Sequence, residues 1–140
     1  MNILIATQKP FAKAAVDGIR EIVESQGHQL YLLEKYEGQD ALVAAVADAD
    51  ALIVRSDKVT NEVLEAAPRL KIVVRAGAGY DNLDLGACTA HGVVAMNTPG
   101  QNANAVAELV IALMIYMSRN QFTPGTGSEI FGKRLGLQAY

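Results

Sequence analysis

The chain has 140 residues, of which 51% are hydrophobic and 19% are charged, so it has the size and composition of one globular domain. Its formal net charge of −3 argues against nucleic acid or an anionic membrane as the partner. The single cysteine, Cys88, excludes an internal disulfide and is typical of a reducing compartment. The longest apolar stretch, 105–117, is shorter than the ~20 residues of a membrane span. We therefore expect a cytoplasmic protein.

Short apolar segments alternate with helical segments through most of the chain. Gly27 and Gly92 are expected to end helices, because glycine accepts the left-handed conformation found there, and Thr60 is expected to cap the third helix. Near-continuously apolar strands that alternate with helices are typical of a doubly wound parallel sheet. We therefore predict an α/β fold with a flavodoxin-like order of five strands. The expected strands are 2–6, 29–33, 50–54, 70–74 and 93–96, and the expected helices are 13–25, 40–47, 61–67 and 83–90.

A glycine-containing loop, 75–79 (Arg-Ala-Gly-Ala-Gly), follows the fourth expected strand. Glycine accepts a positive φ and lets a ligand approach bare backbone. In open α/β sheets, ligands bind outside the carboxyl ends of the strands. Because Arg75 stands beside exposed backbone N–H groups at that edge, the loop suits a carboxylate or a phosphate.

Residues 101–140 have a different pattern. Asn102 or Asn104 is expected to cap a helix that runs to about Arg119 and is apolar on almost every side, so several surfaces must cover it. A loop over 123–128 follows, and 133–140 has the pattern of a strand that begins and is cut off. The sequence therefore suggests a first domain, a linking helix and the opening of a second domain.

Several motifs occur together in this order: Arg55-Ser56 after the third strand, 75–84, 96–102, and Ala-Val-Ala-Glu-Leu at 105–109. They resemble the amino-terminal half of the D-2-hydroxyacid dehydrogenases, and within that family the members that act on 3-phosphoglycerate. The resemblance covers essentially the whole chain. It implies a flavodoxin-like substrate-binding domain over 1–98, a linking helix over 99–120, and over 121–140 the start of an otherwise absent Rossmann domain that binds NAD.

The resemblance also implies roles for individual residues. Backbone N–H groups of the Gly-x-Gly loop would bind the substrate carboxylate, and the arginines would lie near the substrate phosphate. The cation at position 75 favours phosphoglycerate over substrates with uncharged side chains. The implied substrate-binding residues are Arg55, Ser56, Arg75, Ala76, Gly77, Ala78, Gly79 and Asn102, and Ala78 and Val106 would approach the NAD cofactor.

The implied reaction is the NAD-dependent oxidation of 3-phosphoglycerate to 3-phosphohydroxypyruvate in serine biosynthesis, with hydride transfer from C2 and no metal. The family's catalytic histidine, its glutamate partner, its substrate-orienting arginine and its G-x-G-x-x-G fingerprint would lie beyond Tyr140. We therefore expect no catalytic residue in this chain, and no turnover by the chain alone.

Two alternative functions remain open. One is a D-2-hydroxyacid dehydrogenase that acts on glycerate or glyoxylate. The other is a non-catalytic receiver-like module with Asp57 as phospho-acceptor, but a receiver needs an acidic pair after the first strand, where this chain has Ala-Thr-Gln at 6–8. The apolar helix over 105–117 is expected to pack against a second copy or against missing parts of its own chain, and we predict a homo-oligomer, most simply a dimer.

Overall fold

A computed structural model of the protein describes residues 1–138, and these fall into two compact units. The first unit is Met1–Gln101 and contains the sheet, and the second begins at Asn102 and contains one long helix. Within the described residues, no helix combines the length and the apolar character needed to cross a bilayer.

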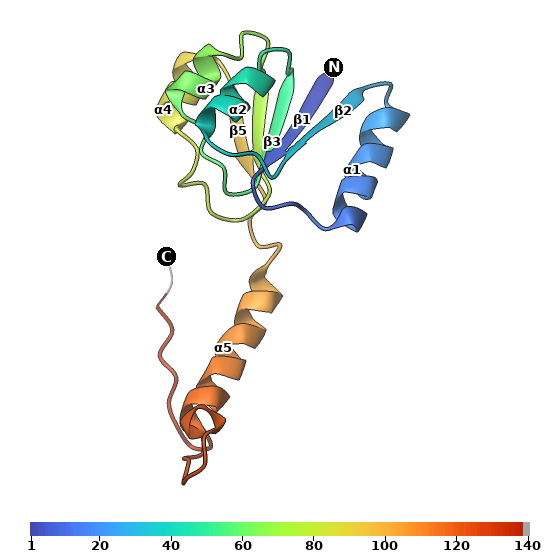
Figure 1. Ribbon diagram of the computed structural model, residues 1–140. Coiled ribbons are helices and arrows are strands. Elements are labelled where there is room, and N and C mark those ends of the chain that lie inside the picture. The colour runs from blue at the N-terminus through green and yellow to red at the C-terminus, as the bar shows by residue number, and fades with distance from the viewer. Residues whose placement is uncertain (139–140) are drawn as a thin grey trace. The chain divides into compact units, whose positions relative to one another are not determined.

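Five parallel strands form the sheet of the first unit (Figure 1), in the order β2-β1-β3-β4-β5. This is the flavodoxin-like order, so both the predicted α/β class and the predicted topology are confirmed. The sequence placed each strand within two residues of its observed bounds. The strands are β1 (Asn2–Thr7), β2 (Gln29–Glu34), β3 (Ala51–Val54), β4 (Ile72–Arg75) and β5 (Val94–Asn97).

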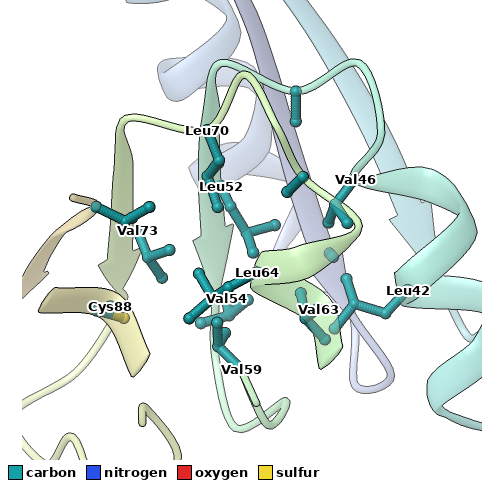
Figure 2. Packing of buried hydrophobic residues seen from close by; sticks show 14 of the residues in the cluster. Leu42, Val46, Leu52, Val54, Val59, Val63, Leu64, Leu70, Val73 and Cys88 are labelled. Atoms are coloured by element: carbon teal, nitrogen blue, oxygen red, sulfur yellow. The ribbon is translucent and has the colours of Figure 1, made fainter. Parts of the chain in front are cut away.

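Helices cover both faces of this sheet because its strands carry apolar residues on both faces. On one face, Ile19 and Val23 of α1 (Lys13–Ser25) pack against a small cluster of buried residues that includes Ile3 and Ile5. On the other face, α2 (Gln39–Ala45), α3 (Asn61–Glu65) and α4 (Leu85–Ala90) cover the main core (Figure 1). Figure 2 shows that core, whose labelled residues are Leu42, Val46, Leu52, Val54, Val59, Val63, Leu64, Leu70, Val73 and Cys88.

Two helix ends follow the expected glycine signal. Gly27 has φ +71° and Gly92 has φ +67°, a conformation that costs an L-residue about 1–2 kcal/mol. After α1, the His28 N–H donates to the Val23 carbonyl at 3.1 Å, and the Gly27 N–H donates to the Glu24 carbonyl at 2.9 Å. This pair of bonds is the Schellman motif, so the prediction that Gly27 ends α1 is confirmed, together with its structural reason.

Three local predictions about helix ends were wrong in part. Thr60 does occupy the N-cap position of α3, but within the described chain its hydroxyl caps nothing and is buried without a partner. Helix α3 ends at Glu65 and not at 67, since residues just before Pro68 are disfavoured in a helix. Helix α4 begins at Leu85 and not at 83, because the Asp84 carboxylate accepts the Ala87 N–H at 2.9 Å and fixes the start there.

The second unit consists of α5 (Ala103–Ser118), the short 3₁₀ turn η1 (Asn120–Phe122) and a chain without regular structure up to residue 138. Asn102 is the N-cap residue of α5, but among the described residues its side chain makes no capping bond. The strand expected to begin at 133 was wrong over 133–138, where nothing pairs with it, and residues 139 and 140 lie outside the described residues. The division into domains at 98 and 120 stays a prediction.

Candidate functional site

The loop that follows β4 uses two of its own amides to hold its shape. The Ala76 N–H donates to the Val54 carbonyl at 2.8 Å, which extends the β3–β4 pairing by one bond. The Gly77 N–H donates back to the Arg75 carbonyl at 2.9 Å. These two amides are therefore unavailable to a ligand, and the predicted row of binding N–H groups is shorter than the sequence suggested.

The remaining loop amides belong to Ala78 and Gly79. Among residues 1–138, neither N–H has an acceptor on the protein. The loop is anchored by its carbonyls, because the Thr98 N–H donates to the Gly77 carbonyl at 3.0 Å and the Asn97 side-chain amide donates to the Ala78 carbonyl at 2.7 Å. A fixed loop that presents two adjacent N–H donors can bind a carboxylate.

The side chain of Arg75 lies directly against the backbone of Gly77. A Cβ added at Gly77 would lie 1.5 Å from Arg75 Nη1 and 2.5 Å from Cζ, so any other residue would displace the guanidinium. Neither Gly77 nor Gly79 has a positive φ. The expected reason for these glycines was therefore wrong in part: neither has a positive φ, and at Gly77 the missing Cβ lets the Arg75 guanidinium lie against the backbone.

Within the described residues, Arg75 has a buried Nε that lacks a hydrogen-bond partner, and no carboxylate lies within ion-pair distance of its guanidinium. An unsatisfied buried donor costs about 1–3 kcal/mol, so an acceptor at this position would be favourable. Guanidinium groups bind carboxylate and phosphate through parallel N–H donors. Arg75, half-buried beside the amides of Ala78 and Gly79, can thus bind a small anion.

Arg55 and Ser56 lie at the same edge of the sheet. In the β3–β4 ladder, Val54 is paired with Arg75, and Arg55 directly follows Val54 in the chain. Adjacent strands lie about 4.8 Å apart, so the backbones of Arg55 and Arg75 are near each other. Both Arg55 and Ser56 are exposed. The structure therefore brings Arg55, Ser56, Arg75 and the loop over 76–79 to one edge.

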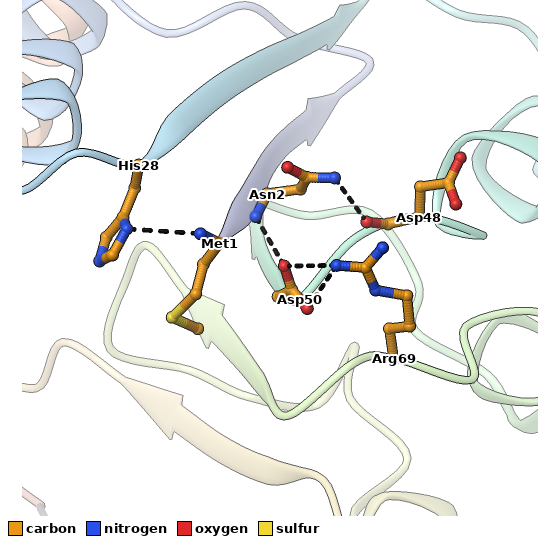
Figure 3. A network of polar contacts seen from close by, with 6 residues as sticks. All are labelled: Met1, Asn2, His28, Asp48, Asp50 and Arg69. Carbon is orange, nitrogen blue, oxygen red and sulfur yellow. Dashed lines mark hydrogen bonds and ion pairs between the residues drawn. The ribbon is translucent and has the colours of Figure 1, made fainter.

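The opposite edge of the sheet differs in its electrostatics (Figure 3). There Arg69 Nη2 contacts both carboxylate oxygens of Asp50, at 3.1 and 3.2 Å, and the backbone N–H of Asn2 donates to the same carboxylate at 2.7 Å. The N–H of Asn2, and then Arg69, hold the pKa of Asp50 below its usual value despite its burial. The arginine at this edge is already paired with a carboxylate, whereas Arg75 has no such partner among residues 1–138.

The remaining two predicted site residues, Asn102 and Val106, lie in the second unit. Asn102 precedes α5, and Val106, in the first turn of that helix, exposes half of its side-chain surface.

Comparison with known proteins identifies the family. The model of the catalytic domain of D-isomer specific 2-hydroxyacid dehydrogenases matches residues 6–132. The chain belongs to this family. A D-3-phosphoglycerate dehydrogenase of Mycobacterium tuberculosis is 45% identical over 113 residues, which cover 71% of this chain and 21% of that protein. One from Sus scrofa is 41% identical over 116 residues, covering 81% and 21%. The chain thus spans about a fifth of the length of these curated relatives.

Solved structures of other family members share the fold. The NAD⁺-bound 3-phosphoglycerate dehydrogenase of Entamoeba histolytica has 51% sequence identity and a TM-score of 0.89, over 93% of this chain and 43% of that one. An NAD-dependent formate dehydrogenase of Staphylococcus aureus has 29% identity and a TM-score of 0.71, over 86% of this chain and 39% of that one. The predicted membership of the D-2-hydroxyacid dehydrogenases is therefore confirmed.

A hollow of about 360 Å³ lies away from the Gly-x-Gly loop. Its only charged lining residue is the acid Asp48, so it does not suit an anion. The hollow is lined by Asn2, Leu4, Tyr31, Leu32, Ala45, Asp48 and Ala49.

Sequence reasoning did not assign two residues, Asn97 and Asp57, to the candidate site that they shape, and it considered Asp57 only as the phospho-acceptor of a receiver-like module. Asn97 holds the Gly-x-Gly loop through Ala78, as described above, and it stood inside a quoted motif as a polar residue ending a strand. Asp57 is buried, and its carboxylate accepts hydrogen bonds from three loops. Its position three residues after the end of β3, next to Arg55-Ser56, was the available signal, but the partners of a buried carboxylate are visible only in three dimensions.

Proposed function

We propose that the chain is the substrate-binding part of an NAD-dependent oxidoreductase that converts 3-phosphoglycerate to 3-phosphohydroxypyruvate. The single observation that carries this proposal is the Arg75 guanidinium, which packs on Gly77 without a carboxylate partner among the described residues, in the loop that also carries the donor amides of Ala78 and Gly79. A site with two adjacent amides and an unpaired guanidinium suits a substrate that carries both a carboxylate and a phosphate. The D-3-phosphoglycerate dehydrogenases among the relatives support the same substrate.

Each group of the site would have one task. The N–H groups of Ala78 and Gly79 would bind the substrate carboxylate, and Arg75 with Arg55 would bind the phosphate, with the Ser56 hydroxyl as a further donor. Ala76 and Gly77 would shape the loop without donating, because their amides are used internally. Asn102, which precedes α5, is the remaining residue that we propose for substrate binding. Binding both ends of the substrate fixes the position of C2, from which the hydride leaves.

The cofactor we propose is NAD, which supplies a nicotinamide that accepts the hydride. Within this chain, Ala78 and Val106, whose side chain is half exposed, are the residues that we propose approach the cofactor, and most of the cofactor would be held by a domain outside it. For the same reason we propose that the chain alone has no turnover. Incubation with NAD and 3-phosphoglycerate should produce no NADH, and measurable NADH would contradict this.

We further propose a cytoplasmic location, a role in serine biosynthesis, and a homo-oligomer formed through the helix over 105–117. The apolar residues of α5 support the last point, because Leu109 and Leu113 expose 57% and 50% of their surface. Sedimentation of the wild-type chain should show a dimer, and the double variant Leu109→Lys and Leu113→Lys should be a monomer. A wild-type chain that sediments as a folded monomer at every concentration would refute the oligomer.

The substrate is tested by titrating the chain with 3-phosphoglycerate and following backbone amide signals by NMR. The amides of Ala78 and Gly79 should shift, and Arg75→Ala should weaken binding about 10- to 150-fold, as expected for loss of hydrogen bonds to a charged group worth ~1.5–3 kcal/mol. Arg69→Ala is the matched control at the opposite edge and should leave the affinity unchanged.

Glycerate in place of 3-phosphoglycerate separates the proposal from its alternative. It lacks the phosphate and should bind weakly to the wild type, with little further loss in Arg75→Ala. If glycerate binds as tightly as 3-phosphoglycerate, or if Arg75→Ala leaves the affinity for 3-phosphoglycerate unchanged, the phosphorylated substrate is wrong and a glycerate- or glyoxylate-type dehydrogenase is favoured.

A further inference from the structure

The carboxylate of Asp57 is buried beside the candidate site, with 6% of the residue exposed. Its Oδ1 accepts the backbone N–H of Gln8 and the hydroxyl of Tyr36, each at 2.8 Å. Its Oδ2 faces the backbone N–H of Arg55 in a longer contact of 3.4 Å. Every polar contact of this carboxylate is therefore with a donor, as a buried charge requires.

These donors come from different loops at the carboxyl edge of the sheet. Gln8 follows β1, Tyr36 follows β2 and Arg55 follows β3. The backbone carbonyl of Asp57 also accepts the side-chain amide of Asn82 at 2.8 Å, and Asn82 lies in the segment that follows the Gly-x-Gly loop. One residue thus connects the chain segments after four successive strands.

The bond from Tyr36 is maintained by its surroundings. Burial, followed by the hydrogen bond to Asp57 and the negative charge of Asp57, raises the pKa of the Tyr36 hydroxyl above its usual value. The hydroxyl therefore remains protonated and donates to the carboxylate at any physiological pH. Hydrogen bonds to an ionised acceptor are also roughly twice as strong as those between neutral groups.

Arg55 itself has an exposed side chain, which by itself is free to adopt many rotamers. Its backbone is the part that the structure restrains, through the contact of its N–H with Asp57. Ser56 lies between these two residues and is restrained with them. This contact therefore restrains the backbone where Arg55 leaves the sheet.

We propose that Asp57 is a positioning residue for anion binding: it acts through the backbone of Arg55 and holds the Arg55–Ser56 segment toward the phosphate of the substrate. The proposal rests on the proposed function, since it needs Arg55 to contact the ligand. Asp57 does not touch the ligand, and its negative charge is taken up by its three donors.

The test compares two carboxylates that are equally buried, because Asp50 at the opposite edge also exposes 6% of its surface. Asp57→Asn keeps the shape of the side chain but places an NH₂ donor against donors, so at least one of the three contacts is lost. Asp50→Asn makes the same change in the network of Figure 3, away from the Gly-x-Gly loop. Tyr36→Phe is a milder second variant, which removes one donor and leaves the carboxylate in place.

The dissociation constant for 3-phosphoglycerate is measured for each variant of the 140-residue chain, well below its unfolding temperature as checked by circular dichroism. Asp57→Asn should weaken binding roughly tenfold, Tyr36→Phe by less, and Asp50→Asn by less than about twofold. In an Arg55→Ala background, Asp57→Asn should have little further effect, because the residue through which it acts is gone. If Asp57→Asn does not fold, the same cycle is run with Tyr36→Phe.

The possible outcomes separate this inference from the proposed function. If Arg55→Ala and Arg75→Ala both leave the affinity unchanged, the proposed anion site is wrong, and the role of Asp57 is overturned with it. If Arg55→Ala weakens binding but Asp57→Asn weakens it no more than Asp50→Asn does, only the positioning role is overturned. The same holds if the effect of Asp57→Asn persists at full size in the Arg55→Ala background.

Discussion

The two units of this chain are both rich in apolar residues, but they use them differently. In the first unit, apolar residues of the strands and of α2–α4 form the main core (Figure 2), and further strand residues are buried in a smaller cluster on the face that α1 covers. In the second unit, α5 has no buried residue within the described chain, although nearly every position from 105 to 117 is apolar. Its only described aromatic contact is the edge-to-face pair of Tyr116 and Phe122, with ring centroids 5.4 Å apart.

The comparison shows that apolar sequence predicts burial only when the covering partner is part of the same unit. Helix α1 has an apolar stripe and a polar face, and the sheet buries Val16 and partly buries Ile19 and Val23, although Ile22 stays exposed. Helix α5 has no polar face, so it needs cover on several sides, which the second unit does not supply. The stability of the chain should therefore reside in the first unit, and substitutions can test this directly.

The largest effect is expected from matched leucine substitutions in the two units. Leu52 is fully buried, and Leu52→Ala should lower the free energy of unfolding by about 2–5 kcal/mol. Leu113 is 50% exposed, and Leu113→Ala should change it by no more than about 0.5 kcal/mol. Urea unfolding followed by circular dichroism, at dilution sufficient to dissociate any oligomer, measures both. Equal losses for the two variants would mean that α5 is covered within the monomer, and the contrast between the units would be wrong.

A smaller effect on stability is expected at the end of α1, where the cost of a substitution is determined by backbone conformation and not by packing. Gly27 has φ +71°, and Gly27→Ala should destabilise the first unit by about 1–2 kcal/mol. The control is Gly18→Ala within α1, where an added Cβ meets nothing within 4 Å and should stabilise by about 0.4–1 kcal/mol. The two changes in thermal unfolding temperature should have opposite signs. A stabilising Gly27→Ala would refute the Schellman assignment.

The sequence predicted the features of the first unit that depend on local pattern. Apolar strands alternating with helices were sufficient for the fold class and strand order, and a glycine after an apolar stripe was sufficient for the end of α1. The failed helix caps at Thr60 and Asn102 had the right residue type in the right place. Whether these side chains accept a hydrogen bond from an N–H group of the first turn depends on their rotamers and neighbours, which a sequence pattern does not determine.

The candidate site divides in the same way. The Arg75 to Gly79 stretch was recognisable from the sequence as a candidate binding loop. The packing of the Arg75 guanidinium on Gly77 was not, because it depends on the rotamer of Arg75. The bond from the Ala76 amide to Val54, and the bonds from Gln8 and Tyr36 to Asp57, are tertiary contacts between segments that are far apart in the chain. In the second unit the strand expected from 133 failed because a strand needs a partner.

The smallest effect is expected in the acid dependence of the first unit, which contains every ion pair found among residues 1–138. The backbone N–H of Asn2, and then Arg69, lower the pKa of Asp50 from its ordinary value of 3.8. A carboxyl group with a lowered pKa in the folded state stabilises the fold above its ordinary pKa, and this stabilisation is lost as the pH falls through the folded value. Wild-type stability should therefore fall below about pH 4 more steeply than that of Asp50→Asn.

The control is Asp48→Asn, since the Asp48 carboxylate is exposed and only its backbone carbonyl is used, by the side chain of Asn2. This variant should keep the acid slope of the wild type. Hydrogen exchange of strand amides as a function of pH assigns the effect to the first unit, and the α5 amides should show no matching change. Parallel acid curves for the wild type and Asp50→Asn would mean that the Asp50–Arg69 pair carries no pH-dependent stability.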